Sequence, residues 1–89
     1  MERKRPEMTF EEFLEGLRTT LHMEIHYNMK RYGALAGHNN GYEFYEWNNP
    51  IGYQHYASLD EFAARANING ALLKNIWDLI DDAGYMNGI

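Results

Sequence analysis

The residue types with the clearest capacity for chemistry lie in one short stretch. His22, Glu24 and His26 alternate along the chain, so on a β-strand their side chains would point to the same side. Two neutral imidazoles and a carboxylate suit zinc or iron, which makes a metal-binding protein one alternative. No second group of ligands accompanies them, and the glutamate is not where a helical HExxH motif requires it. We therefore expect no metal and no cofactor, with these histidines solvated or paired.

Nucleophiles and acid–base pairs are scarce elsewhere. The chain has no cysteine, and its only serine is Ser58, which a helix cap explains. Asp78, Asp81 and Asp82 lie close together, but they fit the solvated face of a helix. No glycine-rich phosphate loop is present. The sequence predicts a protein that is not an enzyme and has no catalytic residues.

The most aromatic stretch is Tyr42–Trp47, which lies between turn signals at Asn40-Gly41 and Asn49-Pro50. This pattern predicts a central strand of an antiparallel sheet. Exposed aromatic residues on a sheet can anchor a protein partner, or they can stack the bases of single-stranded nucleic acid. The predicted interaction surface consists of Glu24, His26, Leu35, Tyr42, Phe44 and Glu46.

Two helix starts share one local signature. Thr9 and Ser58 each precede a glutamate by three residues, Glu12 and Glu61, which forms a capping box. Apolar residues at helical spacing continue the first helix to Leu21.

Two helices are predicted in the C-terminal third. The helix that begins after Ser58 covers about 59–66, and residues 67–70 then interrupt it. A third helix is expected over about 70–83, ending at Gly84.

Between the first and second helices the hydrophobic period changes from 3.6 to 2, which is typical of strands. A two-residue turn at Asn28-Met29 separates the first strand from strands expected at about 30–37, 42–47 and 52–57. A two- or four-residue loop around Asn39-Asn40 would place Tyr45 and Trp47 on the face that the helices cover. A three-residue loop would exchange the two faces of the third strand.

Length, composition and charge restrict the class of protein. The chain has 89 residues and is 45% hydrophobic, which predicts one globular domain. No apolar run has the roughly 20 residues of a membrane span, and the absence of cysteine fits the cytoplasm. Net charge is −5; residues 2–5 sum to +2, so the remainder carries −7. A domain with this negative charge binds the phosphate backbone of nucleic acids poorly, so nucleic acid is not the expected partner.

Several segments resemble small uncharacterised proteins carried by bacterial phages and integrative mobile elements. These segments are Met23–Tyr27, Lys30–Gly33, Gly41–Trp47, Ser58–Phe62 and Leu73–Asp78. The resemblance spans most of residues 9–82 and implies no catalytic motif and no assigned activity. In those proteins a glycine often follows the asparagine of the first turn, where this chain has Met29. The expected order of elements, the small size and the acidity are also similar to some phage anti-CRISPR inhibitors.

The sequence as a whole predicts an α+β protein: one helix, a three- or four-stranded antiparallel meander, then two helices packed on one sheet face. Residues 1–8 would form a flexible basic arm, 9–86 the domain and 87–89 a frayed end. The favoured function is a small acidic module that binds a host protein or a second copy of itself. One form of it is a phage or mobile-element inhibitor of a host nucleic-acid-processing system. A single-stranded nucleic-acid binder and a metal-binding protein remain alternatives.

Overall fold

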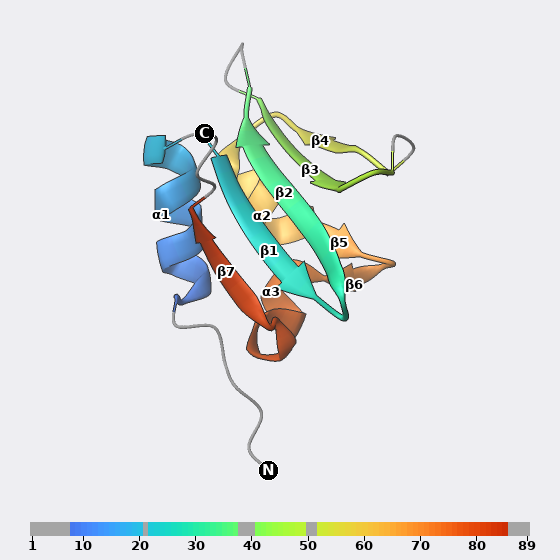
Figure 1. The fold of residues 1–89 in the computed structure, drawn as a ribbon. Coiled ribbons are helices and arrows are strands. Elements are labelled where there is room, and N and C mark those ends of the chain that lie inside the picture. Colours follow the sequence, from blue (N-terminus) through green and yellow to red (C-terminus); the bar gives the residue numbers. More distant parts are fainter. Residues whose placement is uncertain (1–7, 21, 38–40, 50–51, 86–89) are drawn as a thin grey trace.

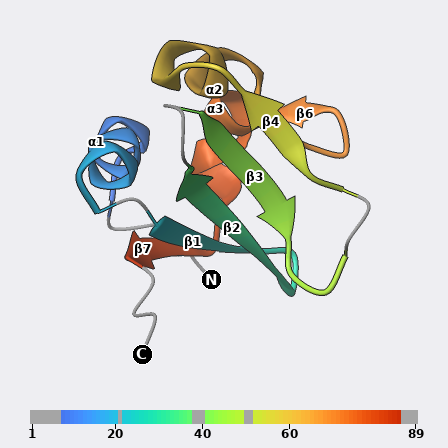
Figure 2. The same ribbon diagram turned by 90° about the horizontal axis from the view of Figure 1, so that it is seen from above.

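The computed structural model describes residues 8–20, 22–37, 41–49 and 52–85. Its main sheet is antiparallel with strand order β4-β3-β2-β1-β7, and the helices lie on one face of it (Figures 1 and 2). The elements are α1 (Phe10–Thr20), β1 (His22–Tyr27), β2 (Lys30–Ala36), β3 (Tyr42–Glu46), β4 (Gln54–Tyr56), α2 (Leu59–Arg65), β5 (Asn67–Ile68), β6 (Ala71–Leu72), α3 (Leu73–Ile76), the 3₁₀ helix η2 (Trp77–Leu79) and β7 (Asp82–Tyr85).

The predicted α+β class, with a helix, a meander and further helices over one sheet face, is confirmed. Three predicted features lie outside the described residues: the basic arm apart from Met8, the Asn39-Asn40 turn, and the tail 87–89.

Both predicted capping boxes are present. At α1 the backbone N–H of Glu12 donates to the Thr9 hydroxyl at 3.0 Å, and the Thr9 N–H donates back to the Glu12 carboxylate at 2.8 Å. At α2 the Glu61 N–H donates to Ser58, while the Glu61 carboxylate accepts from the N–H of Ala57. These bonds satisfy donors that have no partner within the helix, so the helices begin where the sequence predicts.

The β1–β2 hairpin has the predicted two-residue turn. Tyr27 pairs with Lys30 and Ile25 with Tyr32. Asn28 and Met29 have φ values of 54° and 65°, the left-handed conformation that a tight hairpin turn requires at both central positions. Asparagine adopts it readily, whereas methionine does so at a cost.

The pairing of β2 with β3 differs from the favoured prediction. Ala34 lies opposite Phe44 and Ala36 opposite Tyr42, and the Gly37 N–H donates to the Gly41 carbonyl at 2.8 Å. Three residues therefore separate the last paired positions, Gly37 and Gly41. With this odd number, the β3 side chains that a two- or four-residue loop would place on the open face lie on the helix-covered face instead.

One hydrophobic core lies between the sheet and the helices. Its fully buried large side chains include Phe13 of α1, Ile25 of β1, Phe44 of β3 and Phe62 of α2. Phe62 meets the Phe44 ring edge-on, with the ring centres 6.0 Å apart. A core joined by all of these elements explains why so short a chain can hold a single sheet.

The predicted third helix over about 70–83 is wrong. Helical structure covers only α3 and η2, and the chain becomes extended at Ile80, where ψ is 135°. The Asp81 N–H then donates to the His26 carbonyl at 2.9 Å, and β7 pairs with β1. Gly84 lies within this strand, opposite Glu24, and does not cap a helix. The open edge of β1 offers backbone hydrogen bonds that replace those of the expected helix.

The interruption between the last two helices is also more ordered than predicted. Asn69 and Gly70 form a two-residue turn with φ values of 53° and 89°, which joins β5 to β6. Asn69, whose residue type also suits the N-cap expected for a helix starting at about residue 70, therefore belongs to a hairpin turn.

Replacing Met29 with glycine is expected to stabilise the protein. The Met29 side chain is 100% exposed, so no packing is lost. Removal of the strain at positive φ should raise the free energy of unfolding by about 0.5–1 kcal/mol after the larger backbone entropy of glycine is subtracted. Thermal denaturation should show a rise in Tm of roughly 2–8 °C. Asn28→Gly is the matched control and should change Tm little; a lower Tm for Met29→Gly would contradict the turn geometry.

Candidate interaction surface

The sheet face opposite the helices carries a cluster of three aromatic residues, Tyr45, Trp47 and Tyr53, here called the aromatic cluster. Tyr45 and Tyr53 are stacked, with ring centres 5.0 Å apart and planes 11° apart. The Trp47 ring lies 6.4 Å from Tyr45 at an angle of 45°. Tyr53 is 56% exposed, and the other two residues are half-buried. The cluster thus offers ring surface to solvent on the face opposite the described helices (Figure 2).

A glycine fixes the position of the central ring. Gly33 lies directly opposite Tyr45, and a Cβ atom at Gly33 would lie only 2.4 Å from the Tyr45 ring. The ring therefore occupies the space above the Gly33 backbone, and any larger residue there would displace it.

Arg31 and Glu24 extend the cluster across the sheet. The Arg31 guanidinium lies 4.2 Å from the centre of the Trp47 ring, which is a cation–π contact. Its Nε donates to the Glu24 carboxylate at 2.7 Å, and His26 Nε2 lies 2.8 Å from the same oxygen. Partial burial opposes ionisation of Glu24, but these hydrogen bonds from Arg31 and His26 outweigh it and hold the pKa of Glu24 below its ordinary value.

Two further histidines lie on this face. His22 Nε2 is 3.2 Å from the Tyr45 hydroxyl, and His55 Nδ1 is 3.4 Å from the Glu43 carboxylate on the neighbouring strand. Burial, followed by the neighbouring Tyr53, raises the pKa of Tyr45, so its hydroxyl remains protonated.

A hollow of about 480 Å³ adjoins the aromatic cluster at the end of β3. All three cluster residues line it, together with Glu46, Asn48 and Asn49. The indole N–H of Trp47 is buried and has no hydrogen-bond partner among the described residues. An unpaired buried donor is costly, so a partner group that reaches it would gain a favourable contact.

The predicted surface residues divide between the two faces of the sheet. Glu24, His26 and Leu35 lie on the open face, as predicted. Tyr42, Phe44 and Glu46 lie on the helix-covered face instead, because the three-residue separation exchanges the faces of β3. The prediction that Phe44 is exposed is wrong: it retains 1% of its accessible surface.

The favoured face assignment missed the aromatic cluster. Tyr45 and Trp47 were expected in the core, and Tyr53 was not singled out. The alternative three-residue loop would have placed Tyr45 and Trp47 on the open face.

The described residues that could bind a metal or act as a nucleophile or acid–base pair do not come together in one site. Among the described residues, no group of three or more His, Cys, Asp or Glu side chains is placed to hold a metal ion. Ser58 caps α2. The expectation that three aspartates share a helix face is wrong: Asp78 lies on η2, Asp81 follows it and accepts from the Asn28 N–H, and Asp82 begins β7.

Comparison with protein-family models, curated proteins and solved structures finds no significant match to this chain. Within the described parts of the chain, no helix combines the length and apolar character needed to span a bilayer.

Truncation of Phe44 tests the face assignment directly. Phe44→Ala should lower the free energy of unfolding by about 3–5 kcal/mol, because it leaves a cavity against Tyr32 and Phe62. Tyr53→Ala, on the open face, should cost less than about 1 kcal/mol. Urea denaturation of both variants measures the difference; equal losses would contradict the register of β3.

Glu24→Gln tests the charged network. The carboxylate, whose side chain is 18% exposed, should contribute about 1 kcal/mol at neutral pH through its two charged partners. Because the folded-state pKa lies below the ordinary 4.5, this contribution is present above that pH and is lost as pH falls through the folded-state pKa. The stability difference between wild type and Glu24→Gln should therefore disappear in acid. Glu43→Gln serves as a control for loss of a carboxylate on this face.

Proposed function

We propose that this protein is a non-enzymatic interaction module that binds a partner protein through the open face of its sheet. The observation that supports this proposal is the uncovered aromatic cluster beside Arg31. Tyrosine, tryptophan and arginine are the residues most enriched at the energetic centres of protein interfaces. Half-buried Leu35, on the same face, adds apolar surface.

The surface is arranged before any partner binds. Tyr45 is held between the Tyr53 ring, the Gly33 backbone and the His22 imidazole. Arg31 is held between Glu24 and Trp47. Side chains that already have a fixed rotamer lose less entropy when a partner orders them, which favours binding.

The charge of the open face favours a basic protein over nucleic acid. The described strands place three carboxylates on this face, those of Glu24, Glu43 and Asp82, and one guanidinium, that of Arg31. The net charge of these groups is −2 when the histidines are neutral. The whole chain carries −5. Phosphates would be repelled, and a second copy would bring like charges together, whereas a basic surface would be attracted.

Proteins that handle nucleic acids carry such basic surfaces, because they must neutralise phosphates. We therefore propose that the partner is a component of a host nucleic-acid-processing system, which this module would inhibit by covering its basic surface. The resemblance to proteins of phages and mobile elements agrees with this form of the proposal.

The test begins with affinity capture from host lysate, followed by calorimetry with the purified captured protein. Tyr45→Ala/Tyr53→Ala should weaken binding at least about thirtyfold, as expected for an interface centre. Leu79→Ala, which removes a 46%-exposed apolar residue on the helix-covered side, should change affinity less than about twofold. Affinity should also fall as salt is raised.

Other outcomes would overturn the proposal. Retention of the partner by the Tyr45/Tyr53 variant would place binding elsewhere. Titration of labelled single-stranded oligonucleotides with tight, steeply salt-dependent binding would instead support a nucleic-acid binder. A concentration-dependent dimer that the double variant abolishes, measured by sedimentation, would assign the face to self-association.

A further inference from the structure

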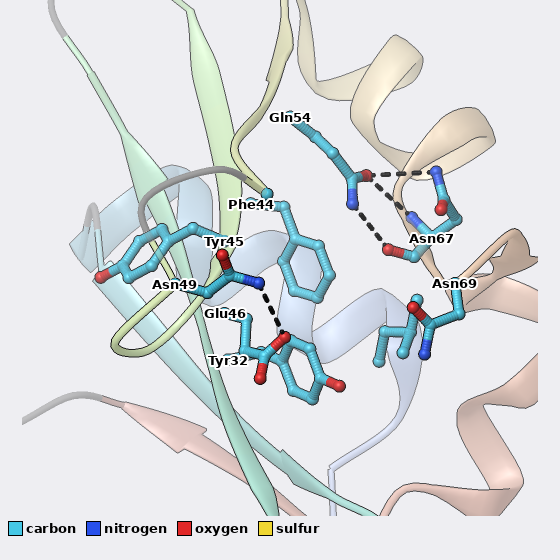
Figure 3. A pocket seen from close by; sticks show the side chains of 10 residues that line it. Tyr32, Phe44, Tyr45, Glu46, Asn49, Gln54, Asn67 and Asn69 are labelled. Carbon is cyan, nitrogen blue, oxygen red and sulfur yellow. Dashed lines mark hydrogen bonds between the residues drawn. The ribbon is translucent and has the colours of Figure 1, made fainter.

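A second concave feature lies on the other side of β3, between the main sheet and the β5–β6 hairpin (Figure 3). This cavity has a volume of about 250 Å³. Tyr32 and Phe44 form part of its wall, with their rings stacked 5.7 Å apart. Glu46 lies directly opposite Tyr32 across the strands and also lines the cavity.

A polar clamp holds the cavity open at one end. The Gln54 side-chain amide donates to the Asn67 carbonyl at 2.7 Å and accepts from the Asn67 N–H at 3.0 Å, so it pairs with β5 as a strand would. The Tyr56 hydroxyl donates to the same Gln54 oxygen at 2.6 Å. Figure 3 shows the Gln54–Asn67 bonds and Asn69 on one side of the cavity, with Tyr45 and Asn49 on the other. The hairpin is thereby fixed at a distance from β3 rather than packed against it.

The Glu46 carboxylate retains acceptor capacity. One oxygen accepts from the Asn49 amide at 3.3 Å, and the other lies 3.6 Å from Lys30 Nζ. The second distance exceeds that of a good hydrogen bond, and the Lys30 side chain is 53% exposed. A carboxylate has about four lone-pair sites, so a ligand with N–H donors can bind without displacing Asn49.

The neighbouring Tyr32 is neutral and almost fully buried. Burial, and then the negative charge of Glu46, raises the pKa of Tyr32, so it stays protonated. The negative charge of Glu46 disfavours anions in the cavity and favours a cation.

We propose that this cavity binds a guanidinium group, with Glu46 as its counter-ion and the almost fully buried Tyr32 and Phe44 behind it. A guanidinium presents parallel N–H donors that match the two oxygens of a carboxylate, whereas an ammonium is a point charge. The cavity is smaller than the roughly 300–1,000 Å³ of pockets for drug-sized ligands, which agrees with a small group. The group comes from a free guanidine compound or from an arginine side chain of a protein.

The experiment is an NMR titration of the full chain with methylguanidinium and, separately, methylammonium. The expected result is saturable shifts at the amides of Tyr32, Phe44, Glu46 and Asn69, with a Kd of about 1–10 mM for methylguanidinium. Methylammonium should bind at least about fivefold more weakly. Amide shifts in α1 report any general effect on the fold.

Two variants on the same strand provide the comparison. Glu46→Gln should weaken methylguanidinium at least about tenfold, while Glu43→Gln, on the open face, should leave Kd within about twofold. Equal binding of both cations, unchanged affinity in Glu46→Gln, or no saturable shift would each overturn the proposal. Tyr45 also lines this cavity, whereas Tyr53 does not. The single variant Tyr53→Ala therefore separates the two proposals: it should weaken partner binding at the open face and leave the Kd of methylguanidinium within about twofold.

A further pair of ligands distinguishes the source of the group. Agmatine carries the guanidinium as a free small molecule, and a capped Gly-Arg-Gly peptide presents it as an arginine side chain. Tighter binding of the peptide would indicate a protein segment as the natural ligand. Tighter binding of agmatine would indicate a small metabolite, and both outcomes keep the guanidinium site.

Discussion

The pairing of β2 with β3 is the constraint on which both candidate sites depend. With Ala34 opposite Phe44, Phe44 enters the core, where it stacks on Tyr32 and meets the edge of Phe62. A shift of one residue would exchange the faces of the strand. Both possible faces of β3 contain aromatic residues and one glutamate. Phenylalanine has no polar group to satisfy, whereas tyrosine and tryptophan tolerate half-exposed positions, so this register buries the residue that gains most from burial.

That near-equivalence explains why the interaction surface was only partly predictable from sequence. The local pattern identified β3 correctly. Which of its side chains face the helices depends on how many residues the loop between β2 and β3 contains, and the asparagine and glycine residues there permit more than one loop length. Glu24 and His26 were placed correctly because the predicted two-residue turn at Asn28-Met29 is the one that the hairpin adopts. The cavity beside Glu46 could not be predicted, since it forms where β3 meets a hairpin distant in sequence.

The C-terminal third shows a different limit. Leu73, Trp77 and Ile80 recur in the sequence at helical spacing and are all buried, because a short helical segment followed by an extended one can still direct them inward. The helix ends early because backbone groups of β1, present only in the folded sheet, pair with β7. The Asn69-Gly70 turn contains the same Asn-Gly dipeptide as Asn40-Gly41. A hairpin turn could therefore have been predicted there, although residues 67–70 were interpreted only as an interruption between two helices.

The two sites share β3 but differ in how they are supported. The aromatic cluster rests on Gly33, where the lack of a side chain leaves room for the Tyr45 ring. The cavity rests on Gln54, which substitutes side-chain hydrogen bonds for strand pairing with Asn67. Because the strand alternates, a partner that moves β3 from the open side would also move Phe44 and Glu46 on the other. The single register of β3 therefore determines which residues each site receives.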